Sequence, residues 1–197
     1  GRESFLPPQE ILQSPKLWVL LLVFAVCGFQ DFFVMTHLVA FADDNGLGSV
    51  LSGNLLALMG VMGLAGVLIT GWIADKFGPM WPTTFCFMFR ILIFAIALFF
   101  QDMVGIMVFA LLYGSTLLIT APLVMVYPVR LFGHRYLGTV AGMIMLVHQL
   151  SGGLGAFIGG WFYDRALHYD GTFTVMIVLA VVAVPLTIAL GNVRTRL

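Results

Sequence analysis

The chain has 197 residues, of which 61% are hydrophobic and only 9% are charged, and its mean hydropathy is +1.06. Soluble domains carry about 25% charged residues, so this composition excludes an ordinary soluble domain and indicates an integral membrane protein. The formal net charge of zero gives no indication of a nucleic-acid partner, and the lipid bilayer is the partner that the composition predicts.

Six apolar stretches are long enough to cross a bilayer, which requires about 20 mostly apolar residues for each helix. Turns rich in Asp, Asn, Gly and Pro separate them. Runs of this length without alternating polar residues are not typical of membrane strands, so we predict an all-α membrane protein. The predicted helices are residues 17–41, 50–74, 82–100, 103–127, 137–163 and 172–191, in a transmembrane bundle over 17–192.

The second and fifth predicted helices match each other at a fixed offset of 89 residues, which takes Trp72 to Trp161. Both helices are rich in glycine and both end in Gly-Trp-x-x-Asp-Lys/Arg. Three crossings separate the copies, so the copies run in opposite directions. This predicts a 3+3 inverted repeat over 17–100 and 103–192, a construction that many secondary transporters use. The alternative is a chance match, helped by the chain's 22 glycines.

The basic residues predict an orientation in the membrane. With six crossings, both ends of the bundle lie on one side; Arg165 is the one basic residue on the opposite side, and Arg90 lies inside a crossing. An excess of Lys and Arg marks the cytoplasmic side. Residues 1–16 and 193–197 are therefore predicted to be a cytoplasmic linker and tail of a multi-pass protein of the plasma or inner membrane. The basic residues on this side are Arg2, Lys16, Lys76, Arg130, Arg135, Arg194 and Arg196.

The segment from Gly71 to Gly78, Gly-Trp-Ile-Ala-Asp-Lys-Phe-Gly, resembles the loop signature of the major facilitator superfamily. That signature is Gly-x-Leu-Ala-Asp-Arg/Lys-x-Gly followed by basic residues, and it lies between the second and third helices of a six-helix half. The basic residues that follow it are missing here. Segments 36–42, 131–139 and 148–155 are similar to monocarboxylate-porter-like and oxalate/formate-porter-like members.

This resemblance implies that the chain is the C-terminal half of a twelve-helix transporter, with an N-terminal six-helix half as its partner. A first residue of Gly rather than Met favours a fragment. In the superfamily, contacts of the signature loop hold the outward-facing state together at the cytoplasmic side. We therefore expect a gate at this loop in which the carboxylate of Asp75 pairs with Arg130 or accepts hydrogen bonds from a helix N-terminus. The alternative is an ordinary solvated charge pair. The expected gating residues are Gly71, Asp75, Lys76, Gly78 and Arg130.

Two charged residues, Asp31 and Arg90, lie within predicted crossings. A charge at the bilayer centre costs roughly 2.5–3.5 kcal/mol, so such groups face a cavity or a partner. One interpretation is a structural ion pair between them. The other is that Arg90 binds an anionic substrate, for which a guanidinium suits a carboxylate, while Asp31 handles a proton. Monocarboxylate porters of animals carry an Asp and an Arg on the second helix of this half, and residues 50–74 contain neither.

Further polar residues in the crossings are weaker candidates for substrate binding or proton coupling. Histidine titrates near neutral pH, so His37 and His148 are either proton relays or hydrogen-bonded packing residues. Gln149, Tyr113, Asn54, Thr116 and Thr120 are candidates for cavity lining. Both cysteines, Cys27 and Cys86, lie in apolar runs without metal-ligand spacing and are expected to pack as small hydrophobes. We therefore predict no metal site and no cofactor.

Together these features predict secondary active transport of a small solute by alternating access. The solute is expected to be an organic anion such as a monocarboxylate, coupled to protons by symport or antiport. The alternative is a transporter-derived sensor or a non-transporting fragment. A membrane enzyme would need a nucleophile and base, paired aspartates or a metal motif, and no such arrangement is recognisable in the sequence. No catalytic residue is therefore assigned.

Overall fold

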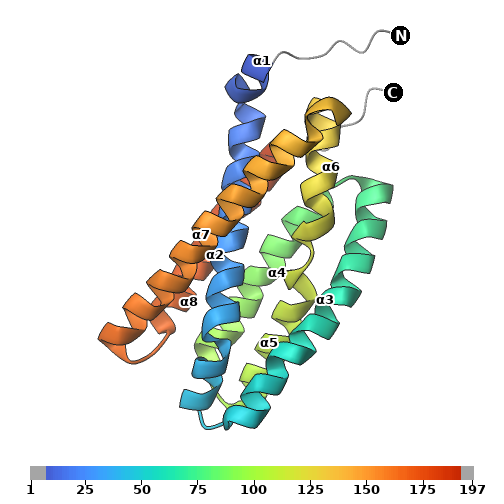
Figure 1. Cartoon of the computed structure of the whole chain (residues 1–197). Coiled ribbons are helices and arrows are strands. Elements are labelled where there is room, and N and C mark those ends of the chain that lie inside the picture. The colour runs from blue at the N-terminus through green and yellow to red at the C-terminus, as the bar shows by residue number, and fades with distance from the viewer. Residues whose placement is uncertain (1–7, 192–197) are drawn as a thin grey trace.

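The computed structural model describes residues 8–191, which form helices and short turns without a strand in that range. Six helical segments are long and apolar enough to cross a membrane, which confirms the predicted fold class (Figure 1). They are α2 (Pro15–Asp44), α3 (Ser49–Phe77), α4 (Met80–Phe99), α5 (Met103–Leu117) continued by α6 (Thr120–Phe132), α7 (Leu137–Ala166) and α8 (Asp170–Leu190).

Two short elements flank these helices. Helix α1 (Pro8–Gln13) lies within the predicted linker, and a 3-10 turn (His134–Tyr136) joins α6 to α7. The first seven residues of that linker and the predicted tail, 193–197, lie outside the described residues. The domain bounds drawn from the sequence therefore remain predictions.

The packing of the six crossings follows the symmetry of the inverted repeat. Helix α2 packs along α7, α3 packs along α5, and α4 packs along α8 (Figure 1). If the first three crossings exchange places with the last three, the α2–α7 pair maps onto the α5–α3 pair. The α4–α8 pair maps onto itself. The tertiary structure therefore has the pairing that a 3+3 inverted repeat requires.

Glycines from the two copies make the same contacts at these crossings. A Cβ atom on Gly155 of α7 would overlap the carbonyl oxygen of Phe29 on α2, and one on Gly66 of α3 would overlap that of Ser115 on α5. Gly66 and Gly155 are equivalent residues of the repeat. Small residues let helix backbones approach closely in lipid, where packing drives helix association. The glycine pattern in the sequence thus fixes where these helices cross.

The repeat also extends to the first and fourth crossings, for which the sequence comparison predicted no match. Gly28 on α2 lies against the backbone of His148 on α7, and Gly114 on α5 lies against the backbone of Met59 on α3. Met59 and His148 are themselves equivalent in the repeat. Each crossing is therefore built from glycines on both helices, and His148 is held directly against α2.

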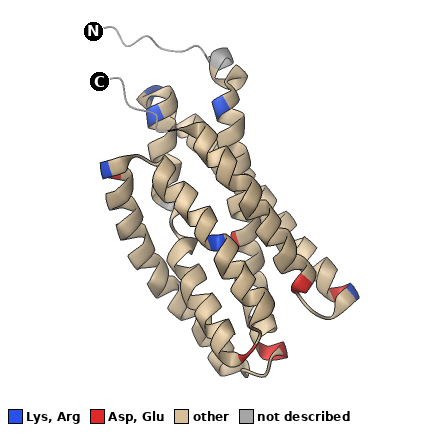
Figure 2. Cartoon of the chain, turned by 180° about the vertical axis from the view of Figure 1, so that it is seen from behind, with Lys and Arg blue, Asp and Glu red and all other residues tan. Residues whose placement is uncertain are grey.

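The Gly-Trp-x-x-Asp-Lys/Arg ends make equivalent contacts as well. The Nζ atom of Lys76 lies 5.2 Å from the ring centroid of Trp72, and the Cζ atom of Arg165 lies 3.8 Å from that of Trp161. Both tryptophans are exposed, as is typical of residues at a membrane–water interface. Elsewhere, Lys and Arg gather at the end of the bundle where α2 begins and α8 ends, and acidic residues gather mostly at the opposite end (Figure 2).

The fourth crossing is interrupted between α5 and α6, at Leu118 and Ile119. Pro122 explains the break, because its ring nitrogen has no hydrogen to donate to the carbonyl of Leu118. Pro128 and Pro185 lie inside α6 and α8 without ending them. Discontinuous helices in transporters are typical of segments that line a binding cavity.

The interior contains two apolar clusters with a polar layer between them. One cluster includes Phe24 and Cys27 on α2, and the other includes Phe33 on the same helix and Phe94 on α4. Gln30 and Asp31 on α2 and Arg90 on α4 are buried between these clusters. The charged groups that the sequence placed inside the membrane therefore meet in the middle of the bundle.

We expect Gly155→Ala to destabilise the fold because the added Cβ overlaps backbone across the α2–α7 crossing. Such overpacking costs about 1–3 kcal/mol. Gly153→Ala on the same helix has open space at its Cβ position and should be neutral, or stabilising by up to about 1 kcal/mol through helix propensity. Thermal unfolding of the purified protein in detergent compares the two variants, and equal midpoints would contradict the close crossing.

Candidate functional site

The centre of the candidate site is an ion pair between two helices. Nη2 of Arg90 on α4 lies 2.7 Å from Oδ1 of Asp31 on α2, and the two side chains are 0% and 7% exposed. The structural ion pair, one of the two interpretations that the sequence left open, is therefore formed. Opposite charges in contact offset part of the cost of burying each one in an apolar bundle.

The remaining donors of Arg90 are also engaged. Its Nη1 donates to Oε1 of Gln30 at 3.1 Å, its Nε to the hydroxyl of Thr116 at 3.2 Å, and its Nη2 also to the Thr116 carbonyl at 3.1 Å. Gln30 is oriented in turn by a 2.9 Å bond from its Nε2 to the carbonyl of Met176 on α8. In this conformation the guanidinium therefore offers no free pair of donors to a substrate carboxylate.

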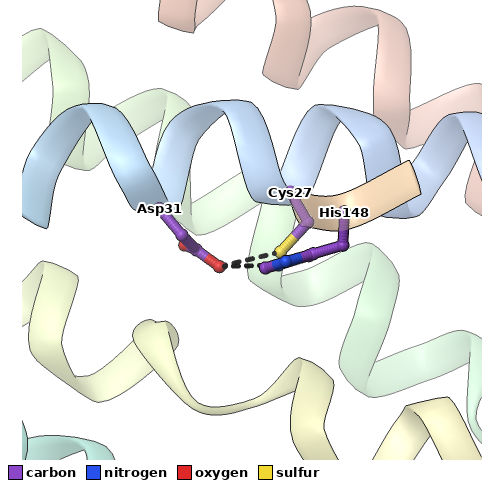
Figure 3. A group of neighbouring side chains, drawn as sticks. All are labelled: Cys27, Asp31 and His148. Atoms are coloured by element: carbon purple, nitrogen blue, oxygen red, sulfur yellow. Dashed lines mark hydrogen bonds and ion pairs between the residues drawn. The ribbon is translucent and has the colours of Figure 1, made fainter. Parts of the chain in front are cut away.

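The two carboxylate oxygens of Asp31 have different neighbours. Oδ1 accepts from Arg90 and, at 2.8 Å, from the hydroxyl of Tyr113 on α5. Oδ2 instead accepts from Sγ of Cys27 at 3.2 Å and lies 3.6 Å from Nε2 of His148 on α7 (Figure 3). The close α2–α7 crossing brings His148 into this position. Four helices therefore contribute to one polar cluster of Cys27, Gln30, Asp31, Arg90, Tyr113, Thr116 and His148.

A cavity of about 720 Å³ lies next to this cluster, between the two repeats. Asp31, His148 and Thr120 are the polar side chains that line it, and the rest of its wall is apolar. The interrupted fourth crossing forms one side. The apolar lining is Phe32, Met35, Leu117, Leu118, Val124, Met125, Gly138, Ala141, Gly142 and Met145. The cavity thus has a volume in the range of small-molecule sites and a single polar region.

Several predicted site residues lie elsewhere. Asn54 is exposed near the start of α3, away from the cluster. Gln149 is exposed, with its Oε1 3.4 Å from Nδ1 of His148. Gly71 has open space around its Cβ position. Of the predicted binding candidates, the structure therefore brings together Asp31, Arg90, Tyr113 and His148 but leaves Asn54 apart.

His37 belongs to a separate aromatic cluster between α2, α7 and the following loop. Its Nε2 lies 2.8 Å from the carbonyl of Ala156, and its Nδ1 lies 3.2 Å from the hydroxyl of Tyr169. The pKa of Tyr169 is raised to about 12, mainly by burial and to a smaller extent by the nearby Asp44 carboxylate. Its hydroxyl therefore stays protonated at neutral pH. A neutral His37 then donates from Nε2 and accepts at Nδ1, which satisfies both ring nitrogens. This geometry is that of a hydrogen-bonded packing histidine.

In the signature loop, Arg130 contacts a backbone carbonyl instead of the expected partner, Asp75. Arg130 donates from Nη2 to the carbonyl of Ala74 at 3.3 Å, and no ion pair joins Arg130 to Asp75 within residues 8–191. The cation thereby satisfies a carbonyl at the C-terminal end of α3, where the helix dipole favours positive charge. Gly78 ends the helix with a φ of 90°, a conformation that favours glycine.

Two members of the cluster, Cys27 and Gln30, were not selected from the sequence. Cys27 was expected to pack as a small hydrophobe, yet its thiol bonds to Asp31. A local signal was available, because residues four apart on a helix share a face. Cys27 and Asp31 are therefore neighbours on α2 from sequence alone. His148, which also lies next to Asp31, could not be added to these two residues without knowing how α2 and α7 cross.

The six long apolar helices define a multi-pass membrane protein with a buried polar cluster at its centre. Residues 1–156 match the sequence model of the Major Facilitator Superfamily, and the chain belongs to that superfamily. This assignment confirms the family resemblance carried by the signature loop. The family match and the relatives described below point to a transporter rather than an enzyme.

Two curated relatives show how much of such a protein the chain represents. It is 26% identical over 141 residues to Monocarboxylate transporter 12-B of Danio rerio, a match that covers 70% of this chain and 30% of that protein. It is 24% identical over 164 residues to the uncharacterized MFS-type transporter YcxA of Bacillus subtilis (strain 168), covering 80% and 40%. The chain therefore spans well under half the length of both relatives.

The ion pair predicts an unusual pattern of stability. We expect Asp31→Asn and Arg90→Gln each to destabilise the fold by about 3–5 kcal/mol, because each leaves the other charge buried without its partner. The double variant removes both charges and should lie closer to the wild type than either single variant. Thermal unfolding in detergent measures all three. A double variant as unstable as the sum of the singles would show that the two charges are not coupled.

Proposed function

We propose that this chain forms half of a secondary transporter that moves a small organic anion, such as a monocarboxylate, together with a proton. The observation that carries this proposal is the cavity, which is apolar except for Asp31, Thr120 and His148. A solute with a hydrocarbon body and one carboxylate has the matching distribution of polarity. The name of the Danio rerio relative supports the same class of solute.

Coupling to a proton follows from the charge of such a solute. Moving one elementary charge against a membrane potential costs about 2.3 kcal/mol per 100 mV. A monoanion that crosses with one proton carries no net charge, so its movement is independent of the potential. Our proposal therefore favours symport of the anion with a proton. The alternative is exchange of the anion for another solute, and the liposome experiment below distinguishes the two.

The roles of the cluster follow from its geometry. Asp31 and His148 reach the cavity, whereas Arg90 lies behind Asp31 and is fully buried. A solute carboxylate that enters the cavity first meets the His148 side of the cluster. Direct binding to Arg90 requires the Arg90–Asp31 pair to open, and alternating access supplies a second conformation in which it does so. Arg90, Asp31, Tyr113 and His148 are thus the proposed binding residues, with Gln149 at the edge and His37 in a packing role.

The partner of the chain in this proposal is an N-terminal six-helix half, which closes the open side of the cavity. Apolar side chains of α3 and α7 such as Leu64, Leu68, Leu150 and Leu154 are exposed and are available to face that half or lipid. We further propose that the basic end of the bundle (Figure 2) is cytoplasmic, as the positive-inside rule predicts. The loop around Asp75, Lys76 and Arg130 then acts as a gate on that side.

The test is uptake by the full-length protein in liposomes that contain a trapped pH dye. Adding a monocarboxylate outside should acidify the lumen faster than in protein-free liposomes, which report passive diffusion of the neutral acid. An amide of the same acid should give no signal. No response across a panel of monocarboxylates would refute this solute class, and uptake without acidification would indicate exchange instead of proton symport.

A pair of neighbouring substitutions localises the transport path without disturbing the buried charges. Met145 lines the cavity and is 44% exposed, whereas Leu146 is 60% exposed and lies outside the lining. Met145→Trp should fill the cavity and reduce the uptake rate by about tenfold or more. Leu146→Trp should retain most of it. Equal rates in the two variants would mean that the solute takes another path.

A further inference from the structure

We propose that Cys27, Asp31 and His148 form a binding site for a borderline-soft divalent cation of the Zn²⁺ class. The three residues each offer one ligand atom, and these atoms all lie within 4.8 Å of one another (Figure 3). Cys27 and Asp31 come from adjacent turns of α2, and His148 comes from α7. The cation would therefore join two helices that already cross closely.

The distances between the ligand atoms fit tetrahedral coordination. Zn²⁺ lies about 2.0–2.3 Å from nitrogen, oxygen and sulfur ligands, which places two ligands of a tetrahedron roughly 3.3–3.8 Å apart. Oδ2 of Asp31 lies 3.2 Å from Sγ of Cys27 and 3.6 Å from Nε2 of His148. The two distances to Oδ2 are therefore close to those of a bound ion, and the sulfur and the imidazole nitrogen, which lie within 4.8 Å of each other, complete the group of three ligand atoms.

The surroundings prepare each ligand atom for this role. Oδ1 of Asp31 is occupied by Arg90 and Tyr113, so Oδ2 is the oxygen that faces the thiol and the imidazole. Nδ1 of His148 lies 3.4 Å from Oε1 of Gln149, so when Nε2 binds the ion, the hydrogen on Nδ1 has an acceptor within reach. Hydrogen bonds of this kind orient the ligands of metal sites.

The site has a path for entry and room for a fourth ligand. Asp31 and His148 both line the 720 Å³ cavity, so a hydrated ion can reach them, and a water molecule or a solute oxygen can complete the coordination. Three protein ligands with one open position are typical of reactive or exchangeable zinc sites, whereas closed sites with four protein ligands are structural. The site is therefore a reversible one at the wall of the cavity, not a closed structural one.

The charges of the cluster decide which ion fits. On binding, the Cys27 sulfur loses its proton to solvent and becomes a thiolate, and Asp31 binds as a carboxylate, so the two ligands together supply two negative charges. Arg90 lies 3.6 Å from Sγ of Cys27; its positive charge stabilises that thiolate but also opposes the cation, which favours moderate affinity. One thiolate, one imidazole and one carboxylate suit Zn²⁺ or Co²⁺, whereas Mg²⁺ requires oxygen ligands.

The experiment titrates the purified full-length protein in detergent with CoCl₂, and then with ZnCl₂ to displace the Co²⁺. We expect one equivalent of Co²⁺ to bind with a sulfur-to-cobalt charge-transfer band, and MgCl₂ not to displace it. Cys27→Ser should abolish the band, and His148→Gln should weaken binding about tenfold or more. Cys86→Ser is the matched control, because Cys86 is the other buried cysteine and lies outside the group. It should bind as the wild type does.

A second measurement keeps the proposal testable if a ligand variant folds poorly. In the Cys86→Ser background, Zn²⁺ should raise the thermal unfolding midpoint of the protein, whereas the same concentration of MgCl₂ should not. Folded wild-type protein that binds no Co²⁺, a band that survives Cys27→Ser, or an unfolding midpoint that Zn²⁺ does not raise would each overturn the site. None of these measurements uses a transported solute, so their failure is separate from failure of the proposed function.

Discussion

The need to bury Arg90 in a membrane bundle constrains much of this structure. A guanidinium in an apolar interior is stable only if its charge is paired and its donors are satisfied. Asp31 supplies the charge, and Gln30 and Thr116 satisfy the remaining donors. Because these partners come from α2 and from the end of α5, the single cation ties helices of both repeats together at the middle of the bundle.

The glycine crossings determine what else can join this pair. Backbone contact between α2 and α7 at Gly28 and Gly155 leaves no room for larger residues and brings His148 over Asp31. The same contact recurs between α3 and α5, where the equivalent of His148 is Met59 and the cluster has no counterpart. The inverted repeat thus provides two equivalent crossings. Sequence differences between the two repeats, such as His148 in place of Met59, make one of these crossings polar.

This asymmetry gives the cavity its chemistry. Its wall carries a carboxylate, an imidazole and the hydroxyl of Thr120, and the remainder is apolar. The break between α5 and α6 adds a non-helical segment to the same wall, which a membrane protein tolerates where backbone lines a cavity. An amphipathic solute and a cation that prefers mixed nitrogen, oxygen and sulfur ligands both match this surface, and the two proposals share Asp31 and His148.

The sequence by itself determined the six crossings, the inverted repeat and the superfamily. Hydropathy, glycine spacing and the signature loop are local patterns, so they can be recognised without knowing how the helices pack. It also identified Asp31 and Arg90, since a charge inside an apolar run stands out. Only the tertiary structure decided that these two pair with each other, that Arg130 binds the Ala74 carbonyl instead of Asp75, and that His148 meets Cys27. Such meetings depend on the rotation and crossing of helices far apart in the chain, which no local pattern records.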